Sequence, residues 1–180
     1  MKATGIVRRI DDLGRIVIPK EIRRTLRIRE GDPLEIYTEK DGEVIFKKYS
    51  PMGEFAETAG QICETLYRTT NCITAVCDRD SMIAAAGAPK RELIDRRIST
   101  ELEHIMEERS ACLRQQDEKP LPVIDGSDKY SAAVAAPIIT AGDLMGCVLF
   151  LETEGSAHAD ELEYKLAQTI AAFLARQLED

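Results

Sequence analysis

The segment formed by residues 15–26 constrains the fold more than any other part of this chain. An apolar run at residues 16–18 predicts a short strand, and Pro19 suits the first position of a helix, where no backbone N–H is needed. The short helix that follows carries Ile22 and Leu26 on one side and arginines on the other. Because so small an element buries only its apolar side, the arginines must face water or a charged partner.

Basic residues are concentrated at this end of the chain. Residues 1–29 contain 9 lysines and arginines against 3 acidic residues, whereas residues 51–180 contain 12 basic and 23 acidic residues. The whole chain has a formal net charge of −8. Because the asymmetry is regional, it favours a phosphate-binding surface in the first 29 residues and argues against nucleic-acid binding only for the acidic remainder.

The first 50 residues predict a very small module rich in β-structure. Its expected strands are residues 4–10, 15–18, 34–38 and 44–47. Residues 11–14 and 41–42 supply the turns. Four short strands and about two helical turns bury too little surface to be stable alone, so we expect a two-fold dimer that also doubles the arginine surface.

Five short motifs in this module follow one known pattern: Gly5-Ile6-Val7-Arg8, Leu13-Gly14-Arg15, Ile18-Pro19, Arg23-Arg24-Thr25-Leu26 and Leu34-Glu35-Ile36-Tyr37. In these motifs, residues 1–51 resemble the DNA-binding domain of the AbrB-type transition-state regulators of spore-forming bacteria. The resemblance implies a swapped-hairpin homodimer, in which hairpins of two chains form one small β-barrel. It also implies that arginines of the loop and helix enter the grooves of DNA.

By this resemblance, four residues are expected to contact double-stranded DNA: Arg8, Arg15, Arg23 and Arg24. The same candidate surface includes Arg9, Lys20 and Arg27. Members of the family read DNA shape and flexibility, so indirect readout is the expected mode. The residues alone also allow a simpler interpretation, in which these side chains pair with nearby carboxylates or coat a solvated helix. Lys47 and Lys48 are interpreted as edge-strand charges that discourage aggregation.

Residues 49–53 have the composition of a joint, and residues 54–180 predict a second, α+β domain. Its expected helices are residues 54–69, 99–113 and 157–178, the second of them with a capping box at Thr100 and Glu103. Its expected strands are residues 73–77, 82–86, 123–124, 130–139 and 144–152.

This order of elements resembles the GAF fold, a scaffold for small-molecule sensors. The likeness to a two-domain member of the AbrB-type family extends to residues 171–177. The signature of GAF domains that bind cyclic nucleotides is missing, so such a ligand is not expected. The domain is therefore expected either to bind an unidentified small-molecule effector or to serve assembly alone.

Metal, cofactor, membrane and catalytic roles find no support in the sequence. The five cysteines are scattered without zinc-site spacing, which is typical of reduced, buried thiols in a cytoplasmic protein. The chain has no apolar stretch long enough to span a membrane and no secretory signal at its start. His104 lies among glutamates on the charged side of an expected helix, and His158 lies at a helix start, so both are interpreted as surface residues rather than general bases. No glycine-rich phosphate-binding loop is present either, so no enzyme activity is expected.

Apolar stripes on the helices at 54–69 and 157–178 are longer than one sheet requires, which predicts that two dimers join there in a homotetramer. The second helix is expected to bury six apolar residues, of which the last three face another subunit: Leu162, Leu166, Ile170, Phe173, Leu174 and Leu178. The resemblance then implies a cytoplasmic, nucleoid-associated transcription regulator of sporulation-phase genes. An antitoxin and a metabolite-binding or catalytic protein with a vestigial basic module are the alternatives.

Overall fold

The computed structural model describes residues 5–115 and 117–179, and the chain divides into two units between Tyr49 and Ser50. Each side of this division is anchored within its own unit. The Tyr49 N–H donates to the Pro33 carbonyl oxygen at 3.1 Å, and the Ser50 hydroxyl donates to an Asp78 carboxylate oxygen at 2.8 Å. The division falls inside the joint expected at residues 49–53.

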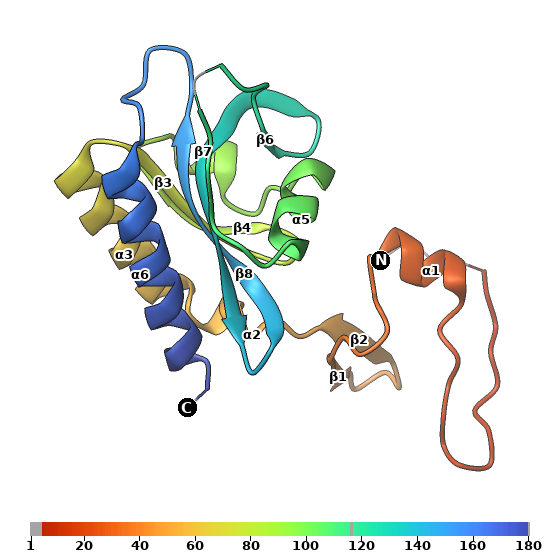
Figure 1. Cartoon of the computed structure of the whole chain (residues 1–180). Helices are drawn as coiled ribbons and strands as arrows, with labels where there is room; N and C mark the ends of the chain where they lie inside the picture. Colours follow the sequence, from red (N-terminus) through yellow and green to blue (C-terminus); the bar gives the residue numbers. More distant parts are fainter. Residues whose placement is uncertain (1–4, 116, 180) are drawn as a thin grey trace. The chain divides into compact units, whose positions relative to one another are not determined.

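The first unit contains one helix and one two-stranded antiparallel sheet, with α1 at Lys20–Thr25, β1 at Leu34–Thr38 and β2 at Val44–Lys48 (Figure 1). The turn between the strands is closed by Glu39, whose N–H donates to the Glu43 carbonyl oxygen at 3.0 Å. Gly42 has a φ of 81°, a conformation that glycine adopts without strain. The strand positions expected from residues 34–47 are confirmed.

The strands expected at 4–10 and 15–18 are not formed within residues 5–18, and Thr4 lies outside the described residues. The turn between them is present, because the Asp11 N–H donates to the Arg15 carbonyl oxygen at 3.0 Å. The flanking side chains lie in solvent, with Val7 87% and Val17 73% exposed. A strand needs a neighbouring strand for its backbone hydrogen bonds, and no strand among residues 5–115 and 117–179 pairs with this segment.

The second unit is built on an antiparallel sheet with the strand order β4-β3-β8-β7-β5, in which β6 also pairs with β7 (Figure 1). The strands are β3 at Ile73–Asp78, β4 at Met82–Ala86, β5 at Cys112–Leu113, β6 at Pro122–Ile124, β7 at Ser127–Thr140 and β8 at Asp143–Glu152. β8 approaches β3 so closely that a Cβ at Gly146 would lie 2.1 Å from the Cys77 carbonyl oxygen. Only glycine fits at this position.

Helices cover both faces of this sheet and enclose a core on each side. The helices are α2 at Pro51–Glu54, α3 at Ala56–Thr70, α4 at Lys90–Leu93, α5 at Thr100–Glu107 and α6 at Glu161–Gln177. In Figure 1, α3 and α6 run along one face and α5 lies against the other. Phe150 and Leu174 are buried in the first core, and Leu102 and Leu149 in the second.

Two helix boundaries differ from expectation because of capping side chains and backbone geometry. The helix expected at 99–113 ends at Glu107, and Arg109 follows with a φ of 57° before β5 begins. Its N-cap is Ser99, whose hydroxyl accepts the Leu102 N–H at 3.0 Å, so the expected cap at Thr100 was wrong. The last helix begins at Glu161 rather than near residue 157, because Asp160 forms a capping box with Glu163.

Candidate nucleic-acid interface

The predicted DNA-contacting residues lie on two consecutive elements of the first unit. The turn at residues 11–15 carries Arg15, with Arg8 and Arg9 on the exposed segment before it. Arg15 Nε donates to an Asp11 carboxylate oxygen at 2.7 Å, and the Arg15 backbone N–H together with this bond lowers the pKa of Asp11. The pairing with a neighbouring carboxylate is therefore real, but it uses only one of the five guanidinium donors.

The remaining candidates belong to α1 and the turn after it. Lys20, Arg23 and Arg24 are exposed on α1. Arg27 is half-buried and has a φ of 49° directly after the helix, where a non-glycine side chain is strained. The structure thus places two groups of basic side chains, one at and just before the turn at residues 11–15 and one on and just after α1.

Apolar side chains of the first unit are left in solvent to an unusual degree. The large exposed ones are Ile6, Val7, Ile10, Leu13, Ile16, Val17, Leu26, Ile36, Tyr37, Val44, Phe46 and Tyr49. Leu26 in particular was expected on the apolar side of α1 and is exposed in the single chain. An apolar surface of this extent on so small a unit marks a protein interaction surface.

Lys48 has a role that its sequence context does not reveal. Its Nζ donates to the Arg27 carbonyl oxygen at 3.1 Å and pairs with an Asp32 carboxylate oxygen at 3.3 Å. The interpretation of Lys48 as a solvated edge charge was wrong, because its side chain is only 24% exposed and that of Asp32 only 3%. The strand pattern does not distinguish it from exposed Lys47, since the partner Asp32 lies in a loop.

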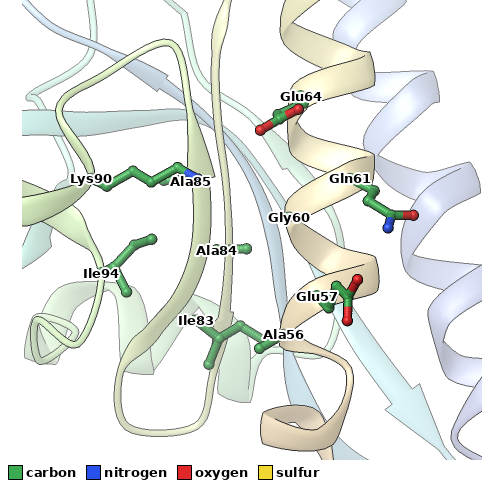
Figure 2. Close-up of a pocket in the computed structure, with 10 residues that line it drawn as sticks. All are labelled: Ala56, Glu57, Gly60, Gln61, Glu64, Ile83, Ala84, Ala85, Lys90 and Ile94. Carbon is green, nitrogen blue, oxygen red and sulfur yellow. The ribbon is translucent and has the colours of Figure 1, made fainter.

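The second unit has a groove between α3 and the edge strand β4, with a volume of about 320 Å³ (Figure 2). Small residues line its middle, namely Gly60, Ala84 and Ala85. Glu57 and Glu64 stand on the α3 side, and Lys90 stands on the opposite wall. The sequence pattern does not reveal this groove, because the residues on its β4 side simply continue a small-residue strand.

Most of the cysteine thiols are buried, and both imidazoles lie beside carboxylates. The cysteines are free, and burial raises the pKa of the Cys63 thiol to about 12 and also raises that of Cys77. His158 pairs with Glu152, and His104 lies 3.8 Å from a Glu107 carboxylate oxygen. Among residues 5–115 and 117–179, no group of three or more His, Cys, Asp or Glu side chains is arranged to hold a metal ion. Within the same residues, no helix is long and apolar enough to cross a membrane.

Comparison with known proteins finds relatives for both units. The chain is 48% identical over 180 residues to stage V sporulation protein T of Bacillus subtilis (strain 168), and the match covers 99% of each chain. It is 63% identical over 51 residues to the transition state regulatory protein AbrB of the same organism, covering 28% of this chain and 52% of that protein. A sequence model of the bacterial antitoxin MazE, described as antidote-toxin recognition, matches residues 7–53, which is less than half of the chain.

The second unit also resembles solved GAF domains. The GAF domain of a phosphoenolpyruvate-protein phosphotransferase from Coxiella burnetii superposes with a TM-score of 0.52 at 16% identity, covering 69% of this chain and 82% of that one. At this identity the likeness concerns the fold alone. The expected fold class, an AbrB-type domain followed by a GAF-like α+β domain, is confirmed.

The family model that matches most of the chain is the C-terminal domain of stage V sporulation protein T, described as a transcription factor, over residues 53–179. Together with the identity over nearly the full length, this match shows that the chain belongs to the stage V sporulation protein T family of sporulation transcription regulators.

Proposed function

We propose that this transcription regulator holds DNA through Arg8, Arg15, Arg23 and Arg24 of a dimer formed by residues 1–51. The observation that carries the proposal is that these basic side chains occupy residues 5–18 and α1, the parts of the first unit whose large apolar side chains are exposed in the single chain. Pairing two hairpins supplies the missing strand neighbours and presents both sets of arginines to one duplex. Substitution of the arginines, read out by the salt dependence of DNA binding, tests the interface.

Charge and geometry favour backbone contacts over reading of individual bases. Arginine presents planar donors that match phosphate oxygens, and phosphate contacts fix register without carrying sequence information. In the first unit α1 has six residues, which gives few side chains to a groove. Specificity would then come from the shape and flexibility of the duplex.

The proposed assembly continues to a homotetramer through the second unit. α6 presents an apolar stripe in which Leu162 is 61% and Phe173 is 47% exposed, with Leu166 and Ile170 half-buried between them. The expectation that Leu174 faces another subunit was wrong, because it is fully buried against its own sheet. The outward side of α3 is polar, so α6 rather than α3 supplies the apolar contact in this proposal.

The proposed role of the second unit includes sensing of an unidentified small molecule, for which the groove beside α3 is the candidate site. A volume of about 320 Å³ falls within the range of small-ligand pockets. The joint to the first unit is short, because Ser50 is tied to Asp78 and Met52 is fully buried. A ligand that prefers one arrangement of the two units could therefore alter DNA affinity, but only by its differential affinity for the two arrangements.

Native mass spectrometry of the full chain purified from its own host tests this sensing role. The expected result is a retained small molecule whose removal changes DNA affinity by roughly 5- to 150-fold, the usual range of coupling between two sites. Glu57→Gln with Glu64→Gln should reduce its retention if the groove is the site. The sensing role would be contradicted if no molecule is retained and if residues inserted between Tyr49 and Ser50 leave DNA affinity unchanged.

The proposal places the protein in the cytoplasm, associated with the nucleoid, and includes no catalytic step. Its antitoxin alternative rests on the first unit alone, which the MazE family description matches. The second unit favours the transcription regulator over the antitoxin, because residues 53–179 match a transcription-factor domain.

A further inference from the structure

The ion pair between Lys48 and Asp32 ties the end of β2 to the chain that follows α1. Lys48 is the last residue of β2 and lies opposite Leu34 in the sheet. Its ammonium group donates to the carbonyl oxygen of Arg27 at 3.1 Å and lies 3.3 Å from the Asp32 carboxylate. The Asp32 carboxylate also accepts the Arg29 backbone N–H at 2.8 Å. One almost fully enclosed carboxylate therefore holds both a strand side chain and the backbone of the turn.

This turn sets where α1 ends. The Arg27 N–H donates to the Arg24 carbonyl oxygen at 3.3 Å, and the Ile28 N–H donates to the Arg23 carbonyl oxygen at 2.8 Å. Arg27 adopts a φ of 49°, which costs free energy for a non-glycine residue and persists only where the surroundings impose it. The contact from Lys48 to the Arg27 carbonyl oxygen is one such constraint, so the ion pair stabilises the turn in this conformation.

We propose that Asp32 and Lys48 are positioning residues that hold α1, and with it Arg23 and Arg24, in the orientation that binds DNA. The inference rests on the proposed interface, because it assigns a task to residues behind it. Backbone hydrogen bonds join Arg23 and Arg24 directly to the turn that Lys48 and Asp32 hold. A rotation of this six-residue helix would move both guanidinium groups together.

A variant of Asp32 gives a test in which electrostatics and the positioning role predict opposite changes in DNA affinity. Asp32→Asn removes a negative charge from the basic unit, so electrostatics alone predicts equal or tighter binding of DNA. The positioning role predicts binding weaker by about 5- to 30-fold, the scale expected when one or two arginines no longer reach the DNA. Anisotropy titration of a labelled duplex with the full chain measures this difference, with circular dichroism and light scattering confirming that the variant is folded and assembled as the parent is.

Lys48→Met has a matched control in Lys47→Met. Each variant removes one positive charge from the end of β2, but Lys47 is exposed whereas Lys48 is largely buried at the turn. We expect Lys48→Met to weaken binding by about fivefold more than Lys47→Met, on the same scale of one arginine's contribution to binding. Lys48→Arg, which keeps the charge and the donors, should restore part of the affinity. This pair of variants decides the question if Asp32→Asn fails to fold.

Repeating Asp32→Asn in a chain that already carries Arg23→Ala and Arg24→Ala distinguishes the positioning role from a purely structural one. Positioning predicts that Asp32→Asn no longer weakens binding there, because the side chains it orients are absent. A general loss of structure would weaken binding in both backgrounds and would overturn the inference. Equal or tighter binding by Asp32→Asn in the parent chain would also overturn it, while the interface stands if Arg23→Ala and Arg24→Ala weaken binding. If these arginine variants bind as the parent does, the interface itself is wrong.

Discussion

Replacing Arg23 and Arg24 with alanine in the full chain is expected to weaken binding to duplex DNA by about 30-fold or more at moderate salt. A hydrogen bond between an arginine and a charged phosphate contributes about 1.5 to 3 kcal/mol, so the loss of two such contacts exceeds this factor. The logarithmic dependence of the binding constant on salt should also become less steep by roughly 0.9 for each phosphate that the variant no longer neutralises. Arg8→Ala and Arg15→Ala are expected to act in the same direction, with a smaller effect for Arg15, which already shares its guanidinium with Asp11.

The matched control removes the same charge from the same unit and leaves α1 unchanged. Lys40→Ala with Lys47→Ala takes two exposed lysines from the β1–β2 hairpin. This control should lose less affinity, because screened charges outside the contact surface contribute little. The assignment of the interface would be contradicted if all four arginine variants, folded and assembled as the parent, bind DNA with unchanged affinity and unchanged salt dependence.

Introducing glutamates at Leu162 and Phe173 is expected to convert the proposed tetramer of the full chain into a dimer. Both side chains belong to the exposed stripe of α6, and burying each in a subunit contact would contribute about 1.5 to 3 kcal/mol. The glutamates remove this contribution and add carboxylates that a buried contact would have to desolvate. Because the chain has a mass of 20.0 kDa, light scattering should report a change from about 80 to about 40 kDa.

Ala172→Glu is the control for this change, because residue 172 is exposed on α6 beside the stripe rather than in it. This variant should remain a tetramer. Dissociation of the control as well would show that any added charge disrupts the assembly, and the α6 stripe would then have no special role. A parent chain of about 40 kDa would remove the tetramer from the proposal and leave the dimer of the first units in place.

Local patterns in the sequence predict an element correctly where that element is stabilised within one chain. The apolar run of β3 predicts a buried strand, and β3 is buried along its whole length. A glycine turn between two short strands predicts the β1–β2 hairpin, and its register follows that turn. In both cases the hydrogen-bond partner lies in the same unit, so periodicity and turn chemistry carry the needed information.

Other features depend on contacts that periodicity does not report. The composition of residues 5–18 predicts strands, but strands need a neighbouring strand, and no described strand pairs with these residues. The pattern after Glu107 predicts more helix, whereas the positive φ of Arg109 ends the helix and the chain turns into β5. Ser99 and Thr100 are both good capping residues, and only the geometry distinguishes Ser99 as the cap.

The candidate sites also include residues that the sequence identifies and residues that only the structure shows. Resemblance to a family pattern identifies Arg8, Arg15, Arg23 and Arg24 as candidates, and the structure adds that the same elements expose large apolar side chains. Asp32 and Lys48 are not recognisable as a pair in the sequence, because they come from a loop and from a strand 16 positions later. The groove beside α3 is not recognisable either, because its lining residues share no motif.

Hydrogen exchange of the full chain with and without duplex DNA tests most directly whether the arginine-bearing unit is the DNA-binding surface. We expect slower exchange on DNA binding in peptides from residues 5–29, since the hairpin and α1 would then lie against the duplex. Peptides from the sheet of the second unit, at residues 73–86 and 127–152, should exchange at the same rate in both samples. Protection confined to the second unit, with residues 5–29 unchanged, would contradict the proposed DNA-binding surface.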